Sequence, residues 1–321
     1  MYNAITDVPG IKVGHYTDKK AVTGCTVILC ETGAVAGADV RGSAPGTRET
    51  ELLRPMNLVE RVHAILLSGG SAFGLDAAGG VMRYLEERDF GYDTLVAKVP
   101  IVPAGIIFDL SIGNPRVRPG IEEGYKACLA ASDKAVTEGC VGAGTGATVG
   151  KALGIEKATK SGLGTASLKI SGDIIVAALV VVNAVGDIID PKTGEILAGP
   201  RNPDNNGFLN TVELLTGGTY SYRQNPLPSN TTLGVVVTNA CLTKEQANKL
   251  AQMAQDGIAR AINPSHTMHD GDTIFALSLG DKITDITILG SVAAEVMSNA
   301  IVRAVHQAET LAGIPAIKDV K

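Results

Sequence analysis

Residues 229–240 read SNTTLGVVVTNA, and the character of the chain changes within this stretch. The preceding residues, 198–230, hold four of the 14 prolines and several asparagines. This composition predicts a long surface loop, with at most one helical turn near Val212–Leu215. From Thr231 to Val237 the residues are mostly β-branched, which predicts a strand. Thr231 therefore lies at the junction between an irregular loop and a strand that reads as buried.

Strand and helix patterns alternate on both sides of this junction. The predicted strands are His63–Ser68, Thr94–Val102, Ile106–Leu110, Thr165–Ile170, Ile174–Val182 and Asp272–Leu279. The predicted helices are Phe73–Glu87, Pro119–Ala135, a helix that begins at the capping box of Thr243 and Gln246, and Ser291–Leu311. This alternation predicts a fold that mixes α and β, and no repeat of fixed period interrupts it.

Composition excludes several classes of protein. The 321 residues are 45% hydrophobic and 19% charged, which is typical of a globular chain and excludes a disordered one. A net charge of −5 leaves no basic excess for a phosphate backbone, so nucleic acid is not an expected partner. The longest apolar run, Ile174–Val182, is far shorter than the roughly 20 residues of a membrane span, and Met1–Gly14 lacks a signal-peptide pattern. Five cysteines without a CxxC pair predict free thiols and a cytoplasmic protein.

A glycine-rich stretch, GAGTGATVGK at 142–151, suggests phosphate binding at first sight. A Walker A loop would need Gly at Thr145 and Ser or Thr at Ala152, and the dinucleotide fingerprint should follow a strand, which this stretch does not. The stretch instead predicts a backbone-lined pocket wall that includes Gly144 and Gly146, with Lys151 pointing into the pocket. No cofactor is expected.

Three other polar residues are candidates for a site. Asp270 and Asp272 are two residues apart at the start of a predicted strand, so both carboxylates can face one site; the alternative is an Asp-Gly turn with two solvated acids. His266 and His269 lie just before the acids, but His-x-x-His followed by DGD matches no standard ligand spacing, and no metal is expected. Asn183 ends a buried apolar strand, where its amide is either a structural hydrogen-bonding group or a donor to an oxyanion.

Thr231 has the position that a self-processing hydrolase gives to its nucleophile. Cleavage before Thr231 would create an α-amine with a pKa of about 7.7–8.0, which suits a general base at neutral pH. That amine can take the proton of its own hydroxyl, which then attacks a carbonyl carbon. The alternative is a β-branched residue that simply begins a strand, and the residues by themselves leave both interpretations open.

The segments SNTTLGVVVTNA and HTMHDGDTIFAL (266–277) resemble the L-aminopeptidase/D-esterase family, which includes β-peptidyl aminopeptidases and nylon-oligomer hydrolases. The resemblance spans nearly the whole chain. It continues at DVRGSAPGTRET (39–50), LLSGGSAFGLDAA (66–78), VGAGTGATVGK (141–151), VVVNAVGDIID (180–190) and SVAAEVMSNAIVRAV (291–305).

The resemblance implies an N-terminal-nucleophile hydrolase with a layered αββα fold of mixed sheets flanked by helices. It implies one hydrolase domain, 1–321, that cleaves itself between Asn230 and Thr231 into a large subunit, 1–230, and a small subunit, 231–321. Thr231 would be nucleophile and base, while Lys151 and Asn183 would hold the nucleophile and the oxyanion. Asp270 and Asp272 would match the acidic pair of the nylon-hydrolase branch.

Two residues depart from the family pattern. Phe108 stands where many members carry Tyr, and Thr231 stands where the aminopeptidases carry Ser. The expected activity is that of an aminopeptidase, amidase or esterase on short peptides, amides or esters. A nylon-type oligoamide hydrolase, an acyl transferase like ornithine acetyltransferase, and an unprocessed binding protein are the alternatives. The resemblance and the low-bulk helix Ser291–Leu311 also predict a homo-oligomer.

Overall fold

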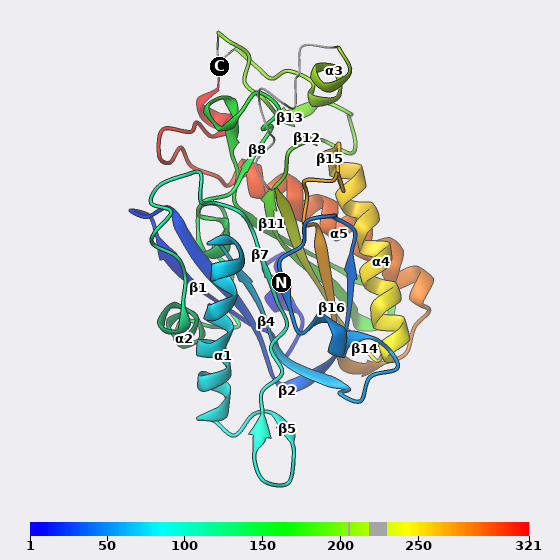
Figure 1. Ribbon diagram of the computed structural model, residues 1–321. Coiled ribbons are helices and arrows are strands. Elements are labelled where there is room, and N and C mark those ends of the chain that lie inside the picture. Colours follow the sequence, from blue (N-terminus) through cyan, green and yellow to red (C-terminus); the bar gives the residue numbers. More distant parts are fainter. Residues whose placement is uncertain (205, 218–229, 321) are drawn as a thin grey trace.

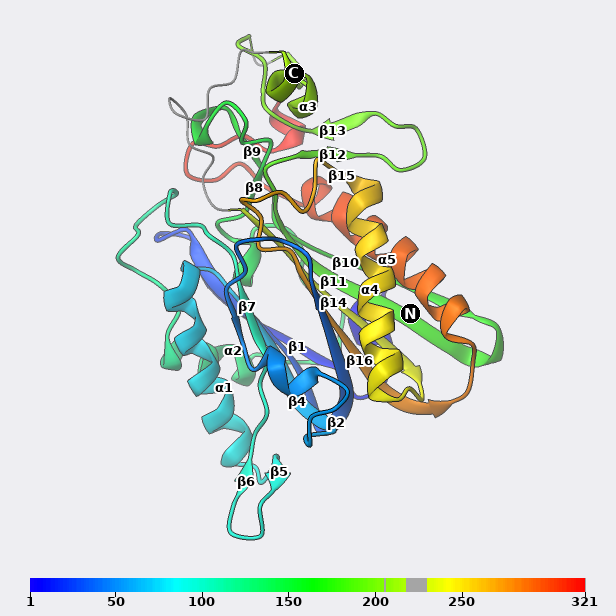
Figure 2. The same cartoon turned by 45° about the vertical axis from the view of Figure 1, so that its right-hand side comes forward.

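The computed structural model describes residues 1–204, 206–217 and 230–320. Its strands lie between two pairs of helices (Figures 1 and 2). One pair is α1 (Ala77–Glu86) and α2 (Ile121–Leu129), and the other is α4 (Lys244–Ala261) and α5 (Ile286–His306). The short helix α3 (Thr211–Thr216) lies apart from both pairs, near the C-terminus.

Nine strands of the described residues form one sheet, in the order β10-β11-β14-β16-β2-β4-β7-β3, with β1 paired to β2. Their bounds are β1 Lys12–Asp18, β2 Thr23–Val40, β3 Thr47–Arg48, β4 Arg61–Ser68, β7 Ala104–Ile106, β10 Leu163–Ile170, β11 Ile174–Asn183, β14 Thr231–Ala240 and β16 Thr273–Lys282. Neighbouring strands are antiparallel except for the pairs β14–β16 and β4–β7. Short strands form three small sheets: β5 Tyr92–Asp93 with β6 Lys98–Val99, β8 Thr148–Val149 with β9 Thr159–Lys160, and β12 Asp187–Ile189 with β13 Ile196–Ala198 and β15 Ile262–Asn263.

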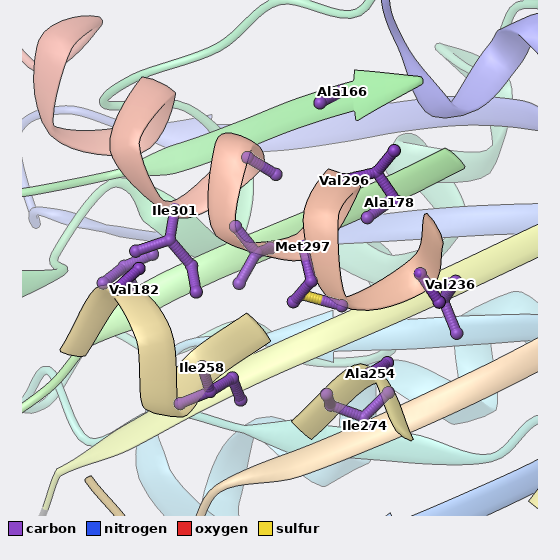
Figure 3. Close-up of a cluster of buried hydrophobic side chains, with 14 of the residues drawn as sticks. Ala166, Ala178, Val182, Val236, Ala254, Ile258, Ile274, Val296, Met297 and Ile301 are labelled. Atoms are coloured by element: carbon purple, nitrogen blue, oxygen red, sulfur yellow. The ribbon is translucent and has the colours of Figure 1, made fainter. Parts of the chain in front are cut away.

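Alternate residues of the long strands enter different hydrophobic cores. In β11, Val180 belongs to the core beneath α4 and α5 (Figure 3), whereas Val181 belongs to a second core that it shares with Ile65 of β4. A third core, which includes Leu66, lies beneath α1 and α2. Strands buried on both faces therefore form two layers between two helical layers, which is the predicted αββα arrangement.

The 18-residue strand β2 joins the two strand layers into one hydrogen-bonded sheet. Its first part, Thr23–Leu29, pairs with β1, and its last part, Val35–Val40, pairs with β16. The local sequence patterns do not identify β1 or β2 as strands. The predicted mixed sheets of the two layers are continuous in the structure, because β2 belongs to both layers.

Several predicted elements have different bounds in the structure. The strand Thr94–Val102 is wrong: the chain forms the hairpin of β5 and β6, because Thr94 and Ala97 hydrogen-bond to each other in a tight turn. The strand Ile106–Leu110 is also wrong beyond Ile106. There the Asp109 carboxylate accepts hydrogen bonds from the Gly70 N–H and the Thr23 hydroxyl, which turns the chain out of the sheet.

The helix predicted to begin at the capping box of Thr243 and Gln246 is confirmed as α4, whereas the other predicted helices are shorter or shifted. Residues Ser71–Asp76 form a 3₁₀ helix before α1, and α2 ends at Leu129. The last long helix begins at Ile286 rather than Ser291 and ends at His306 rather than Leu311. The predicted helical turn near Val212 is confirmed as α3, whereas residues 205 and 218–229 of the predicted loop lie outside the described residues.

The low bulk of α5 serves packing inside the chain. A Cβ at Gly164 of β10 would lie 2.1 Å from the carbonyl oxygen of Ala300, so helix and strand approach closely. A Cβ at Gly257 of α4 would likewise lie 2.4 Å from the carbonyl oxygen of Ala294 in α5. By length and composition α5 could cross a membrane, but 61% of that stretch is buried in the protein, as in a core helix. Its small residues thus give no support to contacts between subunits, and the homo-oligomer stays a prediction.

Candidate active site

The predicted site residues meet where β14 begins. Asn183 ends β11 and pairs with Thr231 in the antiparallel β11–β14 ladder. The loop that leads into β16 places Asp270 and Asp272 beside the same point, because β14 and β16 run parallel. All of these residues and Lys151 are at most 2% exposed. The fold therefore brings together polar groups from four separate parts of the sequence.

Lys151 is buried behind the end of β11. Its backbone N–H donates to the Val185 carbonyl at 3.0 Å, which fixes the segment after β8 against the chain that leaves β11. Its Nζ donates to Asn183 twice, to Oδ1 at 2.7 Å and to the carbonyl oxygen at 2.9 Å. Burial lowers the pKa of Lys151 to about 7, although the charge of Asp270 acts in the opposite direction. A lysine with this pKa can both accept and return a proton near neutral pH.

Asn183 connects Lys151 to two backbone groups. Its Oδ1 also accepts the Thr148 N–H at 3.1 Å, and its Nδ2 donates to the Phe108 carbonyl at 3.1 Å. The Asn183 amide thus has a structural role, which is the first of the two interpretations that the sequence left open. Since Nδ2 carries two hydrogens and the described residues engage one of them, a ligand can still receive the other.

The two acids of the DGD segment differ in their surroundings. Asp272 accepts three hydrogen bonds: Oδ1 accepts the Thr232 N–H at 2.7 Å, and Oδ2 accepts the N–H and Nδ1 of His266 at 3.0 and 2.9 Å. The Oδ2 of Asp270 accepts the N–H and the hydroxyl of Thr267 at 2.8 and 2.5 Å. The Oδ1 of Asp270 is buried and has no hydrogen-bond partner among the described residues.

This difference determines which acid can carry a proton. Burial raises the pKa of Asp270, the charge of Asp272 raises it further, and the hydrogen bonds from Thr267 act against both. Both carboxylates are nearly inaccessible to water, so the alternative of a solvated Asp-Gly turn is wrong. Asp270 combines a raised pKa with an oxygen that no described residue contacts by a hydrogen bond, whereas Asp272 is occupied by donors.

The peptide bond before Thr231 is held by the strand ladder itself. The Asn230 carbonyl oxygen accepts the backbone N–H of Gly271 at 2.8 Å and lies 2.5 Å from the Thr231 hydroxyl. A Cβ at Gly271 would lie 2.8 Å from Thr231 Oγ1 and 2.7 Å from the Ala44 carbonyl oxygen. Sequence reasoning missed Gly271, although a glycine between two acids that face one site is a sign of crowding.

Phe108 contacts the site through its backbone, whereas Gly144 and Gly146 pack against other parts of the chain. Phe108 is half-buried and supplies the carbonyl that binds Asn183. A Cβ at Gly144 would lie 2.5 Å from a backbone nitrogen of β10, and one at Gly146 would lie 2.5 Å from the Cβ of Asp109. Close packing therefore explains both glycines, and their role in a substrate pocket stays a prediction. In the part of the chain that the structure describes, no group of three or more His, Cys, Asp or Glu side chains could hold a metal ion.

The fold places the protein in a known structural class. It is similar to the L-aminopeptidase D-Ala-esterase/amidase from Ochrobactrum anthropi, described as a variant of the Ntn hydrolase fold. The TM-score is 0.71 at 20% identity, over 98% of this chain and 88% of that chain. A β-aminopeptidase from Burkholderia sp. gives a TM-score of 0.67 at 23% identity, over 96% and 87%. The architecture is therefore that of an Ntn hydrolase.

The sequence defines the family. Residues 3–317 match peptidase family S58, and the chain belongs to that family. It is 42% identical to an uncharacterized aminopeptidase of Mycobacterium leprae, over 98% of this chain and 92% of that protein. It is 31% identical to a 6-aminohexanoate-oligomer endohydrolase of Kocuria sp., over 93% of this chain and 84% of that protein. The resemblance found in the sequence is confirmed, and the protein is a hydrolase of the aminopeptidase class.

Proposed function

We propose that this protein is a self-processing amide-bond hydrolase, cleaved between Asn230 and Thr231, that uses the new N-terminal Thr231 as its nucleophile. The observation that carries the proposal is the geometry of this peptide bond. Its carbonyl oxygen accepts the Gly271 N–H at 2.8 Å while the Thr231 hydroxyl lies 2.5 Å away, with both acids and Lys151 buried around it. A residue that merely begins a strand needs none of these buried charges.

Self-cleavage begins when Thr231 Oγ1 attacks the carbonyl carbon of Asn230. Negative charge then develops on the carbonyl oxygen, where the Gly271 N–H stabilises it. The C–N bond breaks, the nitrogen takes a proton and becomes the free α-amine, and an ester links Asn230 to Thr231 Oγ1. Water hydrolyses this ester, which gives the Asn230 carboxylate and restores the hydroxyl.

Two groups are candidates for the proton acceptor in the first step. Lys151, with a pKa of about 7, is partly neutral at neutral pH, and Asp270 has an oxygen without a hydrogen-bond partner in the described part of the chain. Asp272 is less suited, because three donors already occupy it. After cleavage the Thr231 amine becomes the base for its own hydroxyl, since an α-amine has a pKa of about 7.7–8.0.

The substrates we propose are short peptides, amides or esters with a free amino end, as the name of the mycobacterial relative suggests. A nylon-type oligoamide hydrolase is the second candidate, and the acidic pair Asp270 and Asp272 together with the 31% identity to the oligomer endohydrolase favours it. Membership of a peptidase family favours hydrolysis over acyl transfer to an amino acid. Comparing aminoacyl p-nitroanilides with 6-aminohexanoate oligomers as substrates separates the first two candidates.

Intact mass spectrometry of the purified protein tests self-cleavage. We expect two chains, residues 1–230 and residues 231–321, that copurify because the second supplies β14, β16, α4 and α5 to the shared cores. Thr231→Ala should remain one inactive chain, and Thr231→Ser should still be cleaved. A wild-type protein that remains a single chain would contradict the proposal. Cleavage of Thr231→Ala together with loss of cleavage in Thr232→Ala would move the site by one residue.

A further inference from the structure

His266 lies in the loop between β15 and β16 with an unusual backbone. Its φ is +57°, in the left-handed region that residues other than glycine, Asn and Asp rarely adopt. In this conformation the backbone N–H and the ring Nδ1 both reach one oxygen, Oδ2 of Asp272, at 3.0 and 2.9 Å. Backbone and side chain of one residue thus hold the same carboxylate oxygen.

The imidazole ring of His266 makes one hydrogen bond to the described residues, the bond to Asp272. Because Nδ1 faces a carboxylate oxygen, it must carry a hydrogen, and the other nitrogen, Nε2, is buried without a hydrogen-bond partner among the described residues. The His266 side chain is 19% exposed, against 2% for Asp272, so the ring covers the carboxylate from the outside. Among the described residues, Asp272 is therefore the one hydrogen-bond partner that orients the imidazole, and the ring acts on the site through that carboxylate.

Asp272 links His266 to the proposed cleavage site by a further hydrogen bond. Its other oxygen, Oδ1, accepts the backbone N–H of Thr232 at 2.7 Å. Thr232 follows Thr231 directly, and this hydrogen bond fixes the backbone from which the Thr231 hydroxyl projects. A continuous path of three hydrogen bonds therefore links His266, through Asp272, to the first residues of β14.

We propose that His266 is a positioning residue: it fixes the Asp272 carboxylate, and Asp272 in turn fixes Thr232 and the neighbouring nucleophile Thr231. By supplying donors to Asp272, His266 also leaves Asp270 as the acid with an open oxygen. The proposal rests on the proposed self-cleavage at Thr231, since the rate of that reaction is what the positioning controls. A displacement of about 1 Å between reacting groups can cost about a hundredfold in rate.

Asn and Asp at position 266 form a matched pair of variants that tests the contact with Asp272. Asn and Asp have the same shape and both tolerate the left-handed region, but Asn can donate to Asp272 and Asp cannot. His266→Asn should therefore keep the contact, and His266→Asp should replace it with repulsion between two carboxylates. His266→Gly allows the same backbone and supplies no side-chain donor. His306→Ala, at the exposed end of α5, is the control for loss of a histidine.

The experiment measures self-cleavage of full-length chains by intact mass, together with the thermal unfolding midpoint of each variant. We expect His266→Asn and His306→Ala to be cleaved within about threefold of the wild-type rate, and His266→Asp and His266→Gly to be at least about tenfold slower. If the His266 variants have similar unfolding midpoints but only His266→Asn keeps the cleavage rate, the side-chain donor positions the site. A merely structural role of the ring would not give this result.

Two results would overturn the proposal in different ways. If the wild type is cleaved and His266→Asn and His266→Asp are cleaved at equal rates, His266 does not position the nucleophile, while self-cleavage at Thr231 stands. If the wild type is not cleaved, the proposed function fails and this inference fails with it. Should His266→Asp not fold, the comparison of His266→Asn with His266→Gly decides.

Discussion

The backbone N–H of Gly271 donates a hydrogen bond of 2.8 Å to the carbonyl oxygen of Asn230. This bond belongs to the parallel pairing of the segments that begin β14 and β16, where Asn230 and Asp270 form a bridge. The pairing that aligns the two strands therefore also polarises the carbonyl that precedes Thr231. Such a donor contributes to catalysis through its fixed position, because it needs no reorganisation as charge develops on the oxygen.

Gly271→Ala should slow self-cleavage by at least about tenfold. The new Cβ would lie 2.8 Å from Thr231 Oγ1 and 2.7 Å from the Ala44 carbonyl oxygen, so it would displace either the Thr231 hydroxyl or the loop that contains Ala44. The time course of cleavage by intact mass measures the effect. Gly120→Ala is the control, because its Cβ would meet only the flexible Glu123 side chain, at 3.4 Å. Equal cleavage rates for the Gly271 variant and the wild type would contradict this prediction. They would show that the loop around Ala44 makes room for the Cβ without moving the Thr231 hydroxyl.

The candidate residues of the site could be named from the sequence, but their arrangement in the structure could not. The resemblance gave roles to Thr231, Lys151 and Asn183, and the i, i+2 spacing of the two acids indicated that both face one site. Which acid is occupied and which has an open oxygen depends on the left-handed backbone of His266 and on the Thr232 N–H. These are tertiary contacts, and no local sequence pattern encodes them.

The fold shows the same limit in β2. Local patterns identified strands of continuous β-branched residues such as β11, but not a strand with glycines at positions 24, 33 and 37. Gly37 is required by packing, since its Cβ would lie 2.3 Å from the backbone nitrogen of Asn248 in α4. A strand that crosses both layers changes partners along its length, so it has no single alternation of polar and apolar residues.

The two acids should respond differently to substitution in the uncleaved Thr231→Ala background. Asp272→Asn should lower the thermal unfolding midpoint, because an amide cannot accept hydrogen bonds from the Thr232 N–H and from both donors of His266. Asp270→Asn should leave the midpoint unchanged or raise it, since it removes a buried carboxyl whose ionisation is disfavoured by burial and by Asp272. Thermal denaturation at neutral pH measures both. A larger loss for Asp270→Asn would reverse the assignment of the anchoring acid.

Both acid variants should slow turnover by at least about tenfold in the otherwise wild-type chain. Asp270→Asn removes one of the two proposed proton acceptors, and Asp272→Asn releases the backbone next to Thr231, the proposed nucleophile. Hydrolysis of an aminoacyl p-nitroanilide measures the rate, and circular dichroism verifies that the variants are folded. Unchanged rates in two folded variants would remove the pair from the mechanism.

The association state is a separate prediction. We expect a homo-oligomer of processed units, and size-exclusion chromatography with light scattering measures its mass. A species of only 33.1 kDa, the mass of one chain, would contradict it.

The buried Lys151 should make stability depend on pH in a defined direction. Burial lowers its pKa from the usual 10.5 to about 7, so between these values the unfolded chain binds a proton that the folded chain does not. The free energy of unfolding should therefore rise with pH across this window, by up to about 1.4 kcal/mol per pH unit. Below about pH 7 the folded chain must charge the lysine inside the protein, and the penalty is complete.

Chemical denaturation of two uncleaved chains, Thr231→Ala alone and Thr231→Ala with Lys151→Met, tests this dependence. Subtracting the second free energy of unfolding from the first cancels the titrating groups that do not interact with Lys151. The difference should increase by several kcal/mol between about pH 6 and pH 10, because each unit of pKa shift is worth about 1.36 kcal/mol. A difference that stays constant over this range would mean that Lys151 remains charged when folded. It could then serve only as a hydrogen-bond donor to Asn183, and Asp270 would be the proton acceptor for self-cleavage.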